Sequence, residues 1–114
     1  MKRGEVWTAN LNPRRGHEIG KIRPVVIVQT DALTEAAMDT IIIIPITTQL
    51  WPSARSLRLP LPARDQLKRN SYVMVEKLTA LDRDRIGEGP LATLTNEEMA
   101  RVERSLLVVL GMYR

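Results

Sequence analysis

Two short runs of β-branched residues constrain the fold of this sequence more than any other feature. Residues 24–29 read Pro-Val-Val-Ile-Val-Gln, and residues 40–46 are isoleucine at every position except Thr40 and Pro45. β-Branched side chains favour the pleated sheet, and polar residues or proline bound each run, so both predict buried strands. Neither run approaches the roughly 20 apolar residues that a membrane-spanning helix needs. We therefore expect no membrane partner.

Three further segments predict strands, which gives a sheet of about five strands. Residues 5–11 alternate weakly before a proline breaker, residues 56–61 alternate polar and apolar side chains, and residues 72–78 form another strand-like run. Pro60 cannot donate a hydrogen bond to a neighbouring strand, so its segment is expected at an edge. Residues 31–38 contain helix formers and predict a short helix.

The C-terminal segment carries the clearest local signal. Thr95, followed three residues later by Glu98, is a capping box, and apolar residues follow at helical spacing. Gly111 lies where a left-handed residue would end the helix. Apolar side chains at 107–109 extend beyond one helix face, which predicts contact with a second surface such as another subunit. Strands followed by a capped helix indicate one α+β domain over residues 1–114, with a mainly antiparallel sheet.

Positive charge is concentrated near the start of the sequence. The chain has 17 Lys and Arg against 13 Asp and Glu, a net charge of +4, and the first 30 residues hold six basic and two acidic side chains. A basic patch attracts polyanions, so nucleic acid or an acidic protein segment is the expected partner, although a bias toward solubility gives the same pattern. Because Cys is absent and His occurs once, disulfides, thiol nucleophiles and Cys/His zinc sites are excluded. We expect neither a metal nor a cofactor.

The segment 12–22 holds the main candidates for chemistry. Its glycines, cationic side chains and carboxylate are typical of a functional loop. Cleavage of RNA without a metal requires removal of the 2′-hydroxyl proton, neutralisation of the phosphate and protonation of the leaving 5′-oxygen. Arg23 offers a bidentate charge for the phosphate, and His17 and Glu18 are candidate proton carriers. Simpler interpretations are a solvated histidine and an exposed ion pair between Glu18 and Lys21 or Arg23.

Polar and aromatic residues that follow the isoleucine-rich run are further candidates. Thr47 and Thr48 come directly after the predicted strand, where their hydroxyl groups could also satisfy local backbone groups. Trp51 is either a platform on which a base stacks or a plug over the core. The residue pattern leaves these alternatives open.

Four blocks of sequence carry a family resemblance. They are Arg3-Gly4-Glu5-Val6-Trp7; Asn12-Pro13 with Gly16-His17-Glu18 and Lys21-x-Arg23-Pro24-Val25-Val26-Ile27; Pro45-Ile46-Thr47-Thr48-Gln49; and Val75-Glu76-Lys77-Leu78 with Leu81-Asp82 and Arg85-Ile86-Gly87. With these blocks in this order, nearly the whole chain resembles the MazF/PemK toxins of bacterial type II toxin–antitoxin systems.

The resemblance implies a fold and an activity. The fold would be an SH3-like twisted antiparallel β-barrel with short helices and a C-terminal helix, assembled as a homodimer. The activity would be ribosome-independent, metal-free cleavage of single-stranded RNA at specific sequences, leaving 2′,3′-cyclic phosphate and 5′-hydroxyl ends and inhibiting translation and growth in the cytoplasm. The implied protein partner is a cognate antitoxin whose acidic, disordered tail covers the active groove.

The resemblance also assigns residues. The family's catalytic arginine falls on Arg23, its catalytic threonine on Thr47 and its loop carboxylate on Glu18, while His17 matches a branch with histidine there. In that branch an Arg and an Asp two residues apart are implicated in catalysis, and the equivalent positions here are Met74 and Glu76. The usual Gln after the Glu is Lys77. Contact with RNA is expected from Arg14, Arg15, Lys21, Thr48, Gln49, Trp51, Glu76 and Lys77.

Two other functions are compatible with the same fold. A toxin similar to the gyrase-poisoning CcdB proteins would bind a protein and cleave no RNA, and a non-catalytic barrel would bind RNA without turnover. The combination of Glu18, Arg23-Pro24 and Thr47 favours the ribonuclease, because a gyrase binder does not need it.

Overall fold

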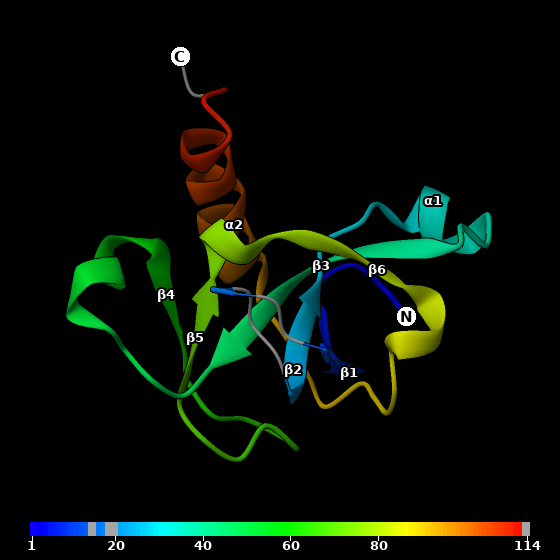
Figure 1. Cartoon of the computed structure of the whole chain (residues 1–114), viewed down its shortest axis with the longest axis horizontal. Helices are drawn as coiled ribbons and strands as arrows, with labels where there is room; N and C mark the ends of the chain where they lie inside the picture. The colour runs from blue at the N-terminus through cyan, green and yellow to red at the C-terminus, as the bar shows by residue number, and fades with distance from the viewer. Residues whose placement is uncertain (14–15, 18–20, 113–114) are drawn as a thin grey trace.

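The described part of the chain folds into a curled antiparallel sheet with a helix at its C-terminal end (Figure 1). The structure is a computed structural model and describes residues 1–13, 16–17 and 21–112. The strands are β1 (Glu5–Asn10), β2 (Ile22–Ile27), β3 (Thr40–Thr47), β4 (Arg58–Leu61), β5 (Ser71–Met74), β6 (Thr79–Asp82) and β7 (Ala92–Thr93). The α-helices are α1 (Asp31–Glu35) and α2 (Asn96–Val109), and the 3₁₀ turns are η1 (Pro52–Leu57), η2 (Val75–Lys77) and η3 (Arg83–Arg85).

Strand β3 joins the two parts of the sheet. The strand order is β4-β5-β3-β2-β1-β7, and β6 also pairs with β3. β6 runs along the first half of β3, where Thr40 lies opposite Asp82, and β5 runs along its end, where Thr47 lies opposite Tyr72. Because β3 pairs with successive strands along its length, the sheet curls into a half-barrel. The predicted α+β class, with a twisted antiparallel sheet and a C-terminal helix, is confirmed.

The structure has more strands than the sequence predicted. β6 and β7 were not expected, because β6 is mostly exposed and lacks an apolar alternation, and β7 has only two residues. The strand predicted over 56–61 begins at Arg58, since η1 precedes it, and the strand predicted over 72–78 ends at Met74, where η2 begins. Pro60 lies on β4, which is an edge strand as predicted.

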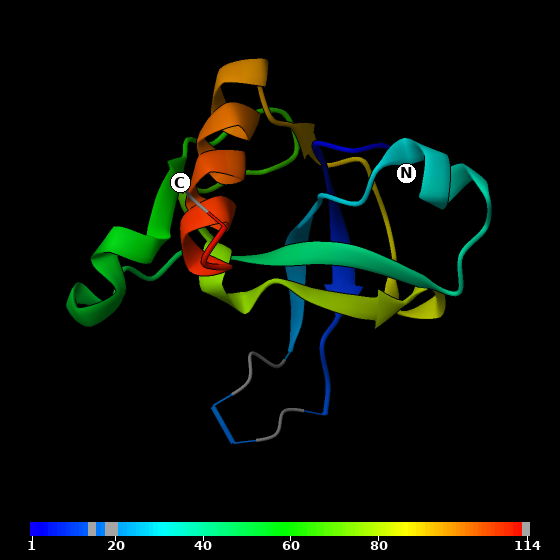
Figure 2. The same ribbon diagram turned by 90° about the horizontal axis from the view of Figure 1, so that it is seen from above.

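Alternating side chains of β2 and β3 build two apolar clusters, one on each face of the sheet. The first cluster includes Met99 and Val102 of α2, and the helix lies over it (Figure 2). The second cluster includes Ala9 and Leu11 at the end of β1. The members from β2 and β3 are Val26, Ile44 and Ile46 in the first cluster and Val25, Ile27, Ile41 and Ile43 in the second. The isoleucine-rich run is therefore a buried strand, as predicted.

Helix α2 begins and ends at the predicted signals. The Thr95 hydroxyl oxygen accepts from the Glu98 N–H at 3.1 Å, and the Glu98 carboxylate accepts from the Thr95 N–H at 2.9 Å, so the capping box is complete. Gly111 has a φ of 70°, and its N–H donates to the Val108 carbonyl at 3.0 Å. This left-handed residue ends the helix.

The C-terminal end of α2 extends away from the sheet (Figure 1). Its last residues and those that follow it carry exposed apolar side chains. We call them the C-terminal patch: Leu107, Val108, Val109, Leu110 and Met112. Val108 is the most exposed of them, at 60%. Among the described residues, no helix has the length and apolar character needed to cross a membrane.

Candidate active site

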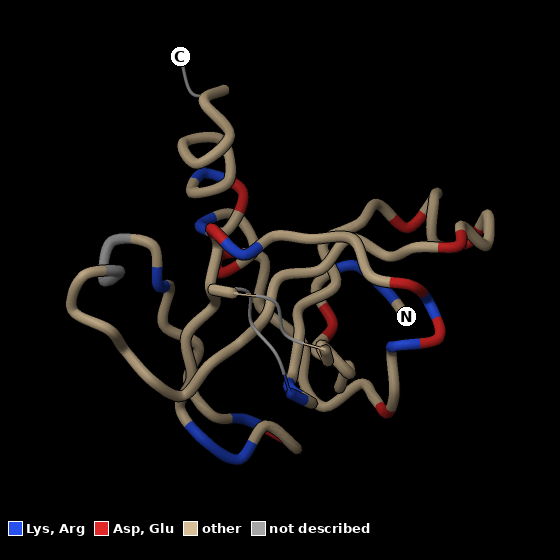
Figure 3. Tube along the Cα trace, in the orientation of Figure 1, with Lys and Arg blue, Asp and Glu red and all other residues tan. Residues whose placement is uncertain are grey.

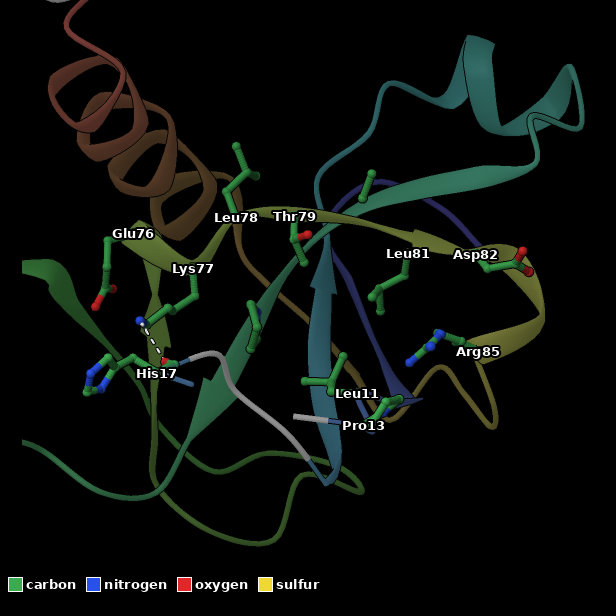
Figure 4. A pocket seen from close by; sticks show the side chains of 12 residues that line it. Leu11, Pro13, His17, Glu76, Lys77, Leu78, Thr79, Leu81, Asp82 and Arg85 are labelled. Carbon is green, nitrogen blue, oxygen red and sulfur yellow. Dashed lines mark hydrogen bonds between the residues drawn. The ribbon is translucent and has the colours of Figure 1, made fainter. Parts of the chain in front are cut away.

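A pocket of about 610 Å³ lies beside the second apolar cluster (Figure 4). The loop after β1, the middle of β3 and the segment from η2 through β6 to η3 form its walls. Its size falls in the range of small-ligand sites. The lining residues are Leu11, Pro13, His17, Pro45, Glu76, Lys77, Leu78, Thr79, Ala80, Leu81, Asp82 and Arg85.

The ionisable groups of the pocket gather at its two ends. His17, Glu76 and Lys77 lie together at one end, and Asp82 and Arg85 lie at the other (Figure 4). The Lys77 ammonium donates to the His17 carbonyl at 3.4 Å, which ties η2 to the loop after β1. The fold thus brings together three predicted site residues: His17 lies beside Glu76 and Lys77, which are about 60 positions later in the sequence.

A buried arginine, Arg58, forms an ion pair with Glu76. One terminal nitrogen of Arg58, Nη1, donates to both carboxylate oxygens of Glu76. The Arg58 side chain is 5% exposed and that of Glu76 is 22% exposed. Arg58 lies directly opposite Met74 in the β4–β5 pair. The Arg58 guanidinium therefore belongs to the residue paired with Met74, the position that holds an arginine in the histidine-bearing branch of the family that the sequence resembles.

Arg23 and Thr47 lie at the same end of the β2–β3 pair. Val25 lies opposite Pro45, so Arg23 and Thr47 are each two residues farther toward that end. Side chains two apart on a strand share a face, and Pro45 lines the pocket. Both predicted catalytic side chains therefore lie on the pocket face, beyond the residues that line the pocket itself.

Thr47 is buried and its hydroxyl is oriented. Its Oγ1 accepts from the Gln49 N–H at 3.1 Å, which leaves the hydroxyl hydrogen available for donation to another acceptor. Thr47 also pairs with Tyr72 of β5, so its backbone is fixed between strands. A hydroxyl donor at a fixed position is suited to binding an anionic oxygen.

Backbone and side-chain hydrogen bonds hold the base of the loop between β1 and β2. The Leu11 N–H donates to the Lys21 carbonyl at 2.8 Å, and the Lys21 N–H donates to the Asn12 side chain at 2.9 Å. Arg85 donates to the backbone carbonyls of Asn10 and Asn12. Lys21 is exposed, at the end of the loop that leads into β2.

Not all predicted residues line the pocket. Thr48, Gln49 and Trp51 are exposed in the segment that follows β3, and Trp51 is 59% exposed. Trp51 is therefore not a plug over the core, and a stacking role remains a prediction. Arg14, Arg15 and Glu18 lie outside the described residues. In the described part of the chain no three His, Asp or Glu side chains are grouped so that they could hold a metal ion.

The predicted site residues did not include Asp82 and Arg85, which line the pocket, or Arg58, which contacts the lining residue Glu76. Arg58 belongs to a segment that was interpreted as alternating, with Arg58 on its polar face, but its side chain is buried against Glu76. A single arginine in an apolar run was the available signal. Asp82 and Arg85 occurred in a resembling block, but no residue pattern predicted that β6 and η3 would form a pocket wall.

The sequence and the fold are similar to those of known proteins. Residues 2–110 match the family described as PemK-like, MazF-like toxin of type II toxin–antitoxin system. Endoribonuclease MazF of Staphylococcus saprophyticus is 31% identical over 99% of this chain and 93% of its own. MazF from Deinococcus radiodurans has a TM-score of 0.80 at 25% identity, over 98% of this chain and 97% of its own. An endoribonuclease in complex with its cognate antitoxin, from mycobacterial species, has a TM-score of 0.73 at 20% identity, over 100% and 96%.

Proposed function

The chain belongs to the PemK-like, MazF-like toxin family of type II toxin–antitoxin systems, and we propose that it is an endoribonuclease that cleaves single-stranded RNA without a metal ion. The observation that carries this proposal is the placement of Arg23 and Thr47 at the same end of β2 and β3, on the pocket face. A guanidinium beside an oriented hydroxyl provides positive charge and a donor for one phosphate group.

In the proposed reaction the 2′-hydroxyl oxygen of the RNA attacks the adjacent phosphorus. Its proton leaves to a base on the protein, the bond from phosphorus to the 5′-oxygen breaks, and that oxygen receives a proton. The products are a 2′,3′-cyclic phosphate and a 5′-hydroxyl. Arg23 neutralises the non-bridging phosphate oxygens, and Thr47 donates its hydroxyl hydrogen to one of them.

The proton carriers in this proposal are His17 and Glu18. His17 lines the pocket, and Glu18 follows it in the sequence. The neutral imidazole ring carries one nitrogen that accepts a proton and one that donates, whereas arginine offers donors only. Of His17 and Glu18, one removes the 2′-hydroxyl proton and the other donates a proton to the leaving 5′-oxygen, while Arg23 acts only as a charge.

RNA binding is proposed to extend beyond the reacting phosphate. Lys21, at the base of the loop between β1 and β2, and Lys77, in the pocket, are assigned to contact the RNA phosphates; basic positions along the backbone are blue in Figure 3. Arg14 and Arg15 are assigned to the same contacts from the sequence. Thr48, Gln49 and the exposed Trp51 are assigned to the RNA strand beyond Thr47, with Trp51 stacking on a base.

The proposed protein partners are a second copy and an antitoxin. The C-terminal patch supports a homodimer, because exposed apolar patches mark interaction sites. An antitoxin with an acidic, disordered tail would fold onto the basic loop and the pocket. RNA targets place this activity in the cytoplasm.

The test is cleavage of a long RNA in EDTA, with product ends mapped, beside Arg23→Ala. Discrete cuts that leave 5′-hydroxyl ends with the wild type, and loss of cleavage with Arg23→Ala, are expected. Arg104→Ala removes an exposed arginine of α2 and is the matched control, while thermal melting checks that each variant is folded. Intact RNA, or near-wild-type cleavage by Arg23→Ala, would contradict the proposal.

A further inference from the structure

One side-chain contact crosses the pocket from η2 to His17. The Lys77 ammonium donates to the His17 backbone carbonyl at 3.4 Å, and both residues line the pocket (Figure 4). A carbonyl that accepts from a fixed donor restricts the backbone of its own residue. Because the imidazole and the carbonyl are attached to the same Cα atom, this contact also restricts where the imidazole can lie.

Lys77 is itself held on a rigid support. Val75, at the start of η2, is fully buried, and Leu78, directly after η2, packs against the first apolar cluster. Glu76 forms an ion pair with Arg58, whose side chain is 5% exposed. The residues on both sides of Lys77 are therefore anchored to the sheet, and packing of this kind gives a functional side chain a defined position.

The start of the loop that contains His17 has a separate anchor. Arg85 donates to the backbone carbonyls of Asn10 and Asn12. These bonds hold the loop at its base, but His17 follows Asn12 by five positions in the sequence. Among the hydrogen bonds of the described residues, the one from Lys77 reaches His17 itself.

We propose that Lys77 is a positioning residue for His17, which it holds by the backbone so that the imidazole stays at the pocket. This inference rests on the proposed function, because it explains how one of the proposed proton carriers is placed. A proton carrier must lie within hydrogen-bond reach of the atom that it serves, so a displacement of about 1 Å lowers the rate. An ammonium group has three hydrogens, so Lys77 can hold the carbonyl and still donate to an RNA phosphate.

The first measurement needs no RNA. His occurs once in the chain, so protein labelled with ¹⁵N-histidine gives one backbone amide signal, whose relaxation reports the order of His17. We expect an order parameter near 0.85 in the wild type, the value of rigid backbone, and a value below about 0.6 in Lys77→Met. A wild-type value already below about 0.6, or no change in Lys77→Met, would overturn the inference.

Lys68→Met is the matched control. Lys68 is exposed and lies outside the pocket, and its ammonium also donates to a backbone carbonyl, that of Asp65, at 3.0 Å. The substitution removes the same charge and the same kind of bond, and we expect it to leave the His17 signal unchanged. Thermal melting checks that each variant is folded. An equal loss of order in both variants would show that the contact with His17 is not the cause.

Cleavage separates positioning from contact with RNA. Single-turnover rates at saturating RNA exclude the binding step, and fluorescence anisotropy of a labelled 2′-O-methyl RNA, which lacks the attacking hydroxyl, gives Kd. We expect the saturated rate of Lys77→Met to fall about tenfold, part of the roughly 100-fold that a proton carrier contributes, and that of Lys68→Met to match the wild type. A higher Kd with an unchanged saturated rate would show that Lys77 only binds RNA. Absence of cleavage by a wild type with an ordered His17 would contradict the proposed function alone.

Discussion

Arg23 on β2 and Thr47 on β3 occupy matching positions on neighbouring antiparallel strands, two residues beyond the pair Val25–Pro45. The two strands approach this end from opposite chain directions, and Thr47 is also paired with β5. The sheet itself therefore fixes the spacing between the proposed phosphate-binding cation and the proposed hydroxyl donor. A site built on paired strands is more rigid than one built on loops.

The Thr47 hydroxyl can be tested by a substitution that keeps the shape of the side chain. Thr47→Val retains the branched side chain but removes the donor, and we expect the cleavage rate to fall about 100-fold, as for other lost donors to a developing anion. The rate is measured on a fluorogenic RNA under single-turnover conditions. Thr93→Val, at an exposed position of β7, should change the rate less than twofold; an equal loss in both variants would contradict the role of Thr47.

Salt dependence reports the contacts between basic side chains and RNA phosphates. The logarithm of the binding constant should fall linearly with the logarithm of salt concentration, and Lys21→Ala should reduce the slope by about 0.7, the value for one phosphate contact on a single strand. Filter binding of a 2′-O-methyl RNA at several salt concentrations gives the slope. Arg104→Ala, which removes the same charge from α2, should leave it unchanged. A binding constant independent of salt would exclude backbone contacts.

Stability at acid pH should depend on Glu98. The Arg64 guanidinium donates to the two Glu98 carboxylate oxygens at 2.6 and 2.7 Å. These bonds hold the pKa of Glu98 below its ordinary value of 4.5. The hydrogen bond from the Thr95 N–H lowers this pKa further, and partial burial acts in the opposite direction. The folded chain therefore binds this proton at lower pH than the unfolded chain, and the stabilisation is complete above the unfolded pKa and is lost as pH falls through the folded pKa.

The measurement is urea unfolding of Glu98→Gln at pH 7 and pH 2.5. We expect this variant to lose about 1–2 kcal/mol of unfolding free energy at pH 7, the size of a charge-assisted hydrogen bond, and to differ little from wild type at pH 2.5. Glu97→Gln changes an exposed carboxylate one residue earlier and should stay within about 0.5 kcal/mol of wild type. The same deficit at both pH values would show that the Glu98 charge is not the cause.

The C-terminal patch should control assembly. Val108→Asp places a charge in the proposed apolar interface and should raise the dimer dissociation constant more than tenfold, the effect of about 1.4 kcal/mol. Sedimentation equilibrium measures it. Leu33→Asp introduces the same charge at an exposed apolar residue of α1 and should leave assembly unchanged. A wild-type protein that stays monomeric at high concentration would refute the interface.

Local signals allowed the sequence to predict some elements well. The capping box at Thr95 and Glu98 requires only residues three apart, so α2 was predicted with its N-terminal boundary. The isoleucine-rich run predicted β3 because a strand that is buried on both faces over most of its length has few polar positions; among its isoleucines, Ile42 is 37% exposed. β6 lacks any such pattern: its residues are mostly exposed, and its pairing with β3 holds it in the sheet.

The resemblance supplied the candidates Glu76 and Lys77, which line the pocket, whereas local pattern predicted neither the pocket nor the contact between Glu76 and Arg58. Arg58 alternates with leucines, which suggests a polar outer face, whereas its partner Glu76 lies 18 residues away. Only the pairing of β4 with β5 brings the two together. The wall of the pocket that contains Asp82 and Arg85 similarly depends on the path of the chain after η2.

Strand β1 pairs with β7, and the cluster that contains Val6 is covered by Met99 and Val102 of α2. Arg3 also pairs with Glu103, at 2.8 Å. Arg3 and Glu103 are 100 residues apart in the sequence. Because contacts between such distant residues close a long loop, covering the first apolar cluster with α2 is expected to be among the slower events of folding.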